Sequence, residues 1–140
     1  MKVYLNRRYR FSASHRLYQP GFSAARNLEV YGKCSNPHGH GHNYVLEVTV
    51  SGQVAPDTGM VCNLVDLDHF VHQHVIDALD TSNLNEMPAF KNVVPTTENL
   101  CRFLYDKLSG AFHHAKVERV RVEETSSNSF EYAGGREIRH

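Results

Sequence analysis

The chain has few of the features that mark several large protein classes. It holds only three cysteines among 140 residues, at positions 34, 62 and 101, and no CxxC pair. An odd count at this spacing argues against a disulfide framework and against a structural zinc finger. The 15 basic and 15 acidic residues cancel. Net charge therefore gives no reason to expect binding to nucleic acid or to an anionic membrane.

Long apolar segments are missing too. No run approaches the roughly 20 apolar residues that span a bilayer, and the first residues, Met-Lys-Val-Tyr, do not begin a signal-peptide core. We therefore expect a cytoplasmic protein with no membrane partner. Since no internal repeat or linker interrupts the chain, residues 1–140 are expected to form a single domain with a core that needs no disulfides.

Histidine, by contrast, is abundant, with ten residues in the chain. Three of them alternate downstream of Cys34, in the stretch Cys-Ser-Asn-Pro-His38-Gly-His40-Gly-His42. Imidazole is a common zinc ligand, and alternate residues of an extended segment point to one face, so His40 and His42 can bind one ion. A metal beside a thiol indicates catalysis, because a catalytic zinc has three protein ligands and one open position.

A third ligand is predicted from the strand pattern. Residues 2–15 alternate as a half-buried strand, and His15 shares the parity of the apolar Tyr9 and Phe11. A second strand is expected from about 42 to 53. When it is extended backwards, His42 and His40 fall on the same parity as its apolar residues. We predict His15, His40 and His42 as the metal ligands; the alternative is a solvated loop plus an ordinary core histidine. A fourth protein ligand, such as His38, would close the site.

The remaining pattern predicts an α+β fold. Residues 16–33 are expected to form a long loop. Behind Asp66 as N-cap, a helical apolar stripe is predicted that consists of Leu67, Phe70, Val71, His74, Val75, Ala78 and Leu79. A polar loop over residues 80–94 precedes a helix capped by Thr96 or Thr97, which ends at Ser109-Gly110. Strands from Lys116 and over about 130–133 complete the order β-β-α-α-β-β. This order predicts a four-stranded antiparallel sheet with two helices on one face.

Three further residues carry candidate chemistry. Cys34 is predicted to be a metal-stabilised thiolate, although free cysteines are more often small buried apolar residues. Glu124 continues the inward parity of Val120 and Val122, so its carboxylate must face a ligand or form an ion pair, for example with an arginine of the first strand. Glu98 stands in a first helical turn, where an acidic residue complements the helix dipole without any ligand.

Together these motifs resemble the 6-pyruvoyl-tetrahydropterin synthase family, which includes the 6-carboxy-tetrahydropterin synthases. The resemblance rests on four segments that occur in order over nearly the whole chain: Ser12-Ala-Ser-His15, Cys34 followed by His40-Gly-His42, Thr96-Thr97-Glu98-Asn99, and Val122-Glu-Glu124-Thr125. It implies the tunnelling fold (T-fold), in which trimers close their sheets into a barrel and pair into homohexamers.

The resemblance also implies a function. Members are zinc-dependent lyases that convert 7,8-dihydroneopterin triphosphate to 6-pyruvoyl-tetrahydropterin and eliminate triphosphate, in tetrahydrobiopterin biosynthesis. It assigns zinc to the three ligand histidines, proton abstraction to Cys34 and pterin binding to Glu124. Thr96, Thr97 and Glu98 are implied as assisting substrate-binding residues. Mg²⁺ is a candidate second ion for activity.

The chain departs from the family pattern at one position. Family members carry an Asp-His pair after the first helix, used with the cysteine in proton transfer, whereas this chain has Asp80-Thr81. Asp80 matches the catalytic aspartate, but a threonine cannot titrate near neutral pH. We hypothesise that His38, which adjoins the metal loop, replaces the missing histidine.

Two alternative functions stay open on the sequence. The 6-carboxy-tetrahydropterin synthases of queuosine biosynthesis use the same substrate but release acetaldehyde; they have three residues between the cysteine and the first ligand histidine, where the pyruvoyl type has five. The repeated His-Gly permits both spacings, to His38 or to His40. The second alternative is a pterin-binding or zinc-binding homologue with impaired catalysis.

Overall fold

The structure, a computed structural model, describes residues 1–138. Its sheet is built on two strands of 14 residues, β1 (Lys2–His15) and β2 (His40–Gln53). They are antiparallel in unbroken register, from Lys2 opposite Gln53 to His15 opposite His40. Their alternating apolar residues predicted both strands, and the second begins two residues earlier than expected. The register sets the histidines of the two strands side by side at one end of the sheet.

Three further strands complete the sheet in the order β3-β1-β2-β4-β5. β4 (Lys116–Thr125) and β5 (Asn128–Tyr132) form the predicted antiparallel hairpin. β3 (Ser82–Asn83) pairs parallel to β1 within the segment predicted as a polar loop. The four predicted strands are confirmed, but the sheet gains a fifth. A two-residue strand is too short to show alternation in sequence.

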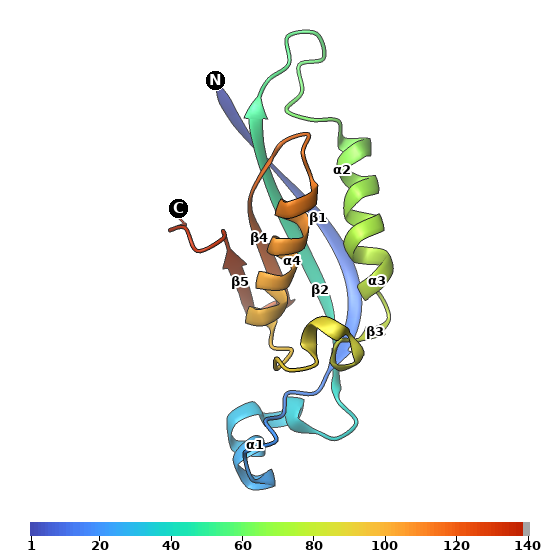
Figure 1. Cartoon of the computed structure of the whole chain (residues 1–140), viewed down its shortest axis with the longest axis vertical. Helices are drawn as coiled ribbons and strands as arrows, with labels where there is room; N and C mark the ends of the chain where they lie inside the picture. The colour runs from blue at the N-terminus through green and yellow to red at the C-terminus, as the bar shows by residue number, and fades with distance from the viewer. Residues whose placement is uncertain (139–140) are drawn as a thin grey trace.

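The predicted helices lie on one face of the sheet (Figure 1). The first comprises α2 (Leu64–Val71), a π-helical turn (His72–Ile76) and α3 (Asp77–Leu79), and the second is α4 (Thr97–Ala111). Thr96 caps α4, as predicted. The predicted cap Asp66 is wrong, because Asn63 accepts the backbone N–H of Val65 at 2.8 Å and starts α2 three residues earlier.

The π-helical turn changes which residues of this helical segment face the core. A π-helical turn holds about one residue more than an α-helical turn, so it rotates the following side chains around the axis. Ile76 is buried as a result, and Ala78, which the predicted stripe placed inside, is exposed. A sequence stripe of constant period cannot show such an insertion.

A helix, α1 (Ala24–Tyr31), lies within the predicted loop over residues 16–33. The Ser23 side chain caps it by accepting the backbone N–H of Arg26 at 3.1 Å. The helix lies beyond one end of the sheet (Figure 1), and its Leu28 and Val30 side chains are exposed. It packs no apolar stripe against the core, which is why periodicity did not predict it. The predicted loop over residues 80–94 likewise contains two 3₁₀ turns, Leu84–Glu86 and Pro88–Phe90.

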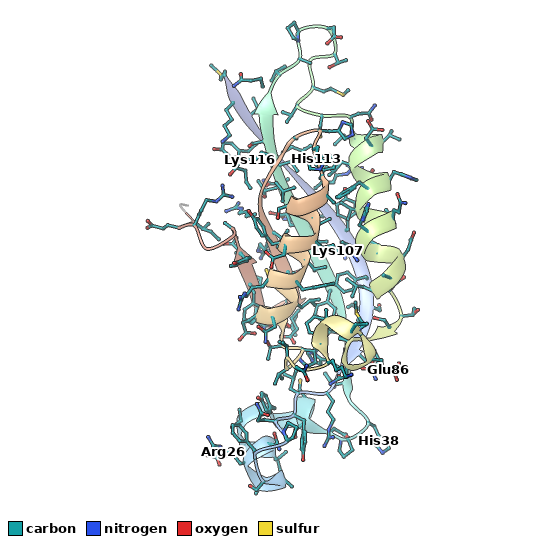
Figure 2. All side chains as sticks on the ribbon, in the orientation of Figure 1. Arg26, His38, Glu86, Lys107, His113 and Lys116 are labelled. Atoms are coloured by element: carbon teal, nitrogen blue, oxygen red, sulfur yellow. The ribbon has the colours of Figure 1, made fainter. Side chains whose placement is uncertain are left out.

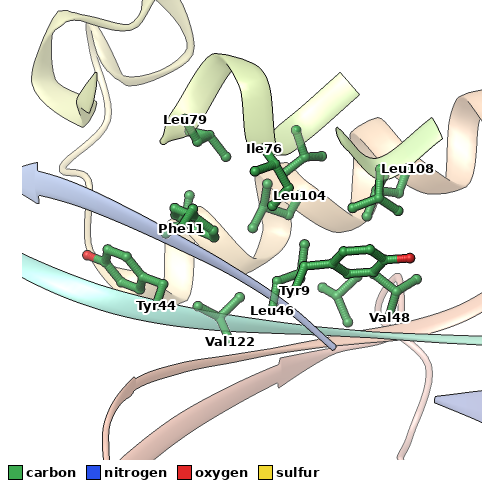
Figure 3. Packing of buried hydrophobic residues seen from close by; sticks show 14 of the residues in the cluster. Tyr9, Phe11, Tyr44, Leu46, Val48, Ile76, Leu79, Leu104, Leu108 and Val122 are labelled. Atoms are coloured by element: carbon green, nitrogen blue, oxygen red, sulfur yellow. The ribbon is translucent and has the colours of Figure 1, made fainter. Parts of the chain in front are cut away.

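The core fills the space between the sheet and the helices (Figure 3). Phe11 of β1 stacks on Tyr44 of β2, with ring centroids 5.1 Å apart, and Leu104 of α4 packs in the same cluster. Along β1 the buried face continues through Ala13 to His15. The apolar core therefore ends at a layer of histidines. No helix within residues 1–138 is long and apolar enough to cross a membrane.

Candidate active site

His15 and His42 meet where the core ends. His15, the last residue of β1, is 0% exposed, and its ring centroid lies 4.9 Å from that of His42 on β2. The Nδ1 atom of His15 is 2.9 Å from the carbonyl oxygen of Pro95, just before α4. Because a carbonyl only accepts, this contact places the ring proton on Nδ1 and leaves the lone pair on Nε2. His15 is thereby prepared as a metal ligand.

Cys34 joins these histidines from a separate part of the chain. It lies in a 3₁₀ turn (Gly32–Ser35) that follows α1. The backbone N–H of Leu17 donates to the carbonyl of Cys34 at 2.7 Å, which ties this turn to the segment leaving β1. One potential ligand atom each from Cys34, His15 and His42 lies within 4.8 Å of the other two.

The surroundings of the two imidazoles fit a bound cation. Both Nε2 atoms are buried without a hydrogen-bond partner among the described residues, a costly arrangement. The Oε1 atom of Glu124 lies 3.2 Å from Nε2 of His42 and 3.8 Å from Nε2 of His15. The lone pair on Nε2 of His15 faces this carboxylate and repels it, and a cation between them would reverse the sign of the interaction. Nitrogen and thiolate donors in this arrangement suit zinc.

The other two histidines of the loop differ in position. His40 is exposed, but its ring centroid lies 4.8 Å from that of His42, so the predicted His15, His40 and His42 set requires the His40 side chain to turn toward the two Nε2 atoms. In the close group, Cys34 occupies the third place instead. His38 is exposed at the outer end of the loop, away from the sheet (Figure 2).

Gly39 allows the histidine loop to approach β1 closely. Its φ of +78° lies in the left-handed region, and a Cβ atom there would come within 3.1 Å of the carbonyl oxygen of His15. Any larger residue would push the two strand ends apart. Glycine at this position therefore brings the β1 and β2 histidines together.

Glu124 stands opposite the metal group, as its parity predicted. The predicted alternative, a pair with an arginine of the first strand, is not formed; its carboxylate faces the two histidines, and Oε2 accepts the side-chain N–H of Asn128 at 2.9 Å. The register of β4 against β5 shifts between Glu123 and Thr125, so Glu124 is the extra residue of a bulge. Bulges redirect side chains and are frequent next to active sites.

Burial sets the protonation of the metal-free site. It lowers the pKa of both His15 and His42 below the ordinary value, so both are neutral near pH 7 and available as ligands. Burial also raises the pKa of the Cys34 thiol, and the Glu124 carboxylate raises it further. Without a nearby cation Cys34 is therefore a weak base, and a bound metal ion would favour the thiolate.

Asp80 and Thr81 lie apart from this group within one chain. The Oδ1 atom of Asp80 accepts the backbone N–H of Ser12 at 2.8 Å, and the N–H of Thr81 donates to the carbonyl of Ser12 at 2.6 Å. Asp80 lines a hollow with Arg10, Ser12 and Asn43, which belong to the opposite strand parity from His15 and His42. In the single chain, this pair holds the end of the helical segment onto β1.

The predicted assisting residues lie at the start of α4. The Thr96 hydroxyl accepts the N–H of Asn99 at 3.2 Å, so it serves as the N-cap. Thr97 is 2% exposed, and its hydroxyl has no hydrogen-bond partner of good geometry among the described residues. Glu98 is exposed in the first turn, where it complements the helix dipole. Of the three, Thr97 has a buried hydroxyl, which interacts with the Tyr44 side chain in the core.

Thr81 carries backbone strain that a substitution is expected to relieve. Its φ of +61° is the only positive value among non-glycine residues in the described range. The left-handed conformation costs a β-branched residue roughly 1–2 kcal/mol, whereas asparagine tolerates it. We expect Thr81→Asn to raise the free energy of unfolding by about 1 kcal/mol, as measured by urea denaturation. Thr58→Asn, in a turn without positive φ, is the control; equal effects of the two variants would contradict the prediction.

Two contacts of the site were not predicted. The Pro95 carbonyl orients His15, and a backbone group has no signature in sequence. Asn128 was missed for another reason: it begins β5 directly after the Ser-Ser hairpin turn, where serine and asparagine are expected for conformational reasons alone. Only the bulge at Glu124 brings its amide to the carboxylate.

The chain is similar to known proteins in both sequence and structure. The family model described as 6-pyruvoyl tetrahydropterin synthase matches residues 4–135. A Homo sapiens 6-pyruvoyl tetrahydrobiopterin synthase is 44% identical over 131 residues, which cover 93% of this chain and 90% of that protein. A putative 6-carboxy-5,6,7,8-tetrahydropterin synthase of Archaeoglobus fulgidus is 38% identical over 103 residues, 74% of this chain and 81% of that protein. The structure of Caenorhabditis elegans 6-pyruvoyl tetrahydropterin synthase superposes with a TM-score of 0.89 at 39% identity, covering 96% of this chain and 97% of that one.

Proposed function

The chain belongs to the 6-pyruvoyl tetrahydropterin synthase family, and from that premise we propose that it is a zinc-dependent lyase acting on 7,8-dihydroneopterin triphosphate. It eliminates triphosphate and forms 6-pyruvoyl-tetrahydropterin. The observation that carries the proposal is the buried group of His15, His42 and Cys34, with two Nε2 atoms that lack partners and face Glu124. Two buried imidazoles with unpartnered Nε2 atoms and a thiol beside them are the groups that a catalytic zinc and a neighbouring base would use.

We assign the metal to His15 and His42, with His40 as third ligand once its side chain turns inward. A bound zinc supplies Lewis acidity, which makes protons next to the substrate's side-chain hydroxyls easier to remove. Keeping Cys34 out of the ligand set leaves its thiolate free to accept such a carbon-bound proton. The electron pair left on carbon then supports departure of the triphosphate and the redistribution of the side-chain oxidation state.

Glu124 is the proposed anchor of the pterin ring. A carboxylate can accept two parallel N–H bonds from an amino-pyrimidine edge, which orients the ring as well as binding it. Its position opposite the histidines would hold the substrate side chain over the metal and Cys34. Thr97, with its buried hydroxyl, is the stronger candidate for assisting this binding, since Thr96 serves as a helix cap and Glu98 is exposed.

The second proton transfer requires a group from outside this arrangement. Asp80 and His38 do not belong to the close group of His15, Cys34 and His42, so we assign this transfer to one of them acting from a second copy. The family's hexamer, a dimer of trimers with sites between subunits, would bring copies together in this way. Pairing between copies would also cover the outer edges of the sheet at β5 and along most of β1.

The product distinguishes the proposed lyase from its alternatives. We expect the protein, supplied with zinc and Mg²⁺, to release triphosphate and to give a pterin with the mass of the 6-pyruvoyl compound, without acetaldehyde. Formation of acetaldehyde and the 6-carboxy product would assign the queuosine-type reaction instead. Substrate binding without triphosphate release at any pH would identify a catalytically impaired pterin-binding protein. Either result would overturn the proposal.

A further inference from the structure

Asn128 contacts Glu124 but has no place in the proposed reaction so far. Glu124 uses its two oxygens differently: Oε1 faces the two histidines, and Oε2 accepts the Asn128 amide N–H at 2.9 Å. The Glu124 side chain is only 14% exposed, and the Asn128 amide donates the hydrogen bond that Oε2 accepts. The orientation of Oε2 therefore depends on this amide.

Contacts within the β4–β5 hairpin fix the orientation of the Asn128 amide. The backbone N–H of Ser127 donates to the Thr125 hydroxyl oxygen at 3.1 Å, and that hydroxyl hydrogen-bonds with Oδ1 of Asn128. A hydroxyl whose oxygen already accepts one bond is free to donate, which identifies Oδ1 as the acceptor and directs the Asn128 NH₂ group to Glu124. The turn thus forms a directed chain of donors that ends on the carboxylate.

The bulge at Glu124 explains why this chain is needed. Glu123 pairs with Ser129 and Thr125 with Asn128, so Glu124 has no partner residue on β5. An unpaired bulge residue lacks the cross-strand neighbour that would otherwise restrict its side chain. Asn128 supplies the missing restraint from the opposite strand.

We propose that Asn128 is a positioning residue for substrate recognition: its amide holds the Glu124 carboxylate in the plane in which both oxygens accept N–H donors from a planar amino-pyrimidine edge. The inference rests on the proposed role of Glu124 as pterin anchor. Each carboxylate oxygen keeps a lone pair that can accept an N–H of the ring, because Asn128 occupies only one of the lone pairs on Oε2. Asn128 itself has no contact with the substrate's reacting atoms, so its loss should affect binding more than chemistry.

The test compares Asn128→Ala and Asn128→Asp with a matched surface pair. We expect both variants to raise KM and to weaken binding of 7,8-dihydroneopterin, which lacks the triphosphate, by about 10-fold, the usual scale for removing a supporting hydrogen bond. The value of kcat should stay within about twofold of the parent. Asn128→Asp should be the more severe, since it sets a second carboxylate against Glu124. Asn92→Ala and Asn92→Asp, at an exposed residue away from the hairpin, should change nothing.

A double-mutant cycle separates positioning from general stability. In a Glu124→Ala background, Asn128→Ala should cause no further loss of pterin binding, because its target is gone. Equal losses with and without Glu124, or parental pterin affinity in both Asn128 variants, would overturn the inference. If Glu124→Ala itself keeps full pterin affinity, the proposed anchor role fails first. Asn128→Asp preserves a turn-forming side chain, so it remains informative if Asn128→Ala destabilises the hairpin.

Discussion

Cys34→Ala is expected to lower kcat for triphosphate release by about 10²–10⁴-fold, the range associated with loss of a catalytic acid or base. The thiol lies within 4.8 Å of the ligand atoms of His15 and His42, and no other thiol belongs to this group in the described residues. Substrate affinity should change little, because pterin binding is assigned to Glu124. Steady-state assays and equilibrium binding of the substrate to the variant would measure both effects.

Cys62→Ala is the matched control for this prediction. Cys62 is also half-buried and free, but it precedes α2 and lies outside the histidine group. This variant should keep parental kcat. If Cys34→Ala retained more than a tenth of the activity while its zinc content was normal, the thiol could not be the main base.

Removal of zinc is expected to abolish activity and to destabilise the fold together. A metal that binds only the folded chain adds RT ln(1 + [L]/Kd) to stability, about 4 kcal/mol when its free concentration is 1,000 times Kd. Dialysis against a chelator should therefore lower Tm by several degrees, and added zinc should restore both Tm and turnover. His42→Ala should prevent zinc binding, as judged by metal analysis, while the exposed His72 provides the control variant His72→Ala. One zinc per chain in His42→Ala would refute the ligand assignment.

The metal-free protein should also show a specific pH dependence. Burial lowers the folded-state pKa of His15 and His42, so their unprotonated forms are favoured by the folded state. The two histidines therefore contribute to folding stability at pH values above their unfolded-state pKa of about 6.5. This contribution is lost as the pH falls through their lower folded-state pKa values. Thermal unfolding of the metal-free protein should show Tm falling between pH 7.5 and 5.5. This slope should be smaller in His42→Ala; an unchanged slope would argue against buried neutral histidines.

The strands and the histidine positions could be predicted because they depend on local periodicity. A strand with one buried face repeats every two residues, so the apolar residues of β1 and β2 revealed both their span and the inward face of His15 and His42. The same rule placed Glu124 inward on β4. These are the residues that the structure brings together.

Other features depend on contacts between distant segments. Three elements carry no periodic signal in the sequence. The π-helical turn shifts the phase of its helix, α1 packs no apolar stripe against the core, and β3 has only two residues. The separation of Asp80 from Cys34 likewise depends on where the chain after the helical segment meets β1, which is at Ser12. Sequence order gives no information on that choice.

The sequence by itself therefore determined the α+β class, the sheet's inward face and the set of residues able to bind a metal and act on a pterin. The tertiary structure decided their roles. It placed the proton of His15 through the Pro95 carbonyl, put Cys34 beside two buried imidazoles, and directed Glu124 and Asn128 toward each other across a bulge. Side-chain chemistry and periodicity are local properties of the chain, whereas distances, burial and hydrogen-bond direction arise only when separate segments pack together.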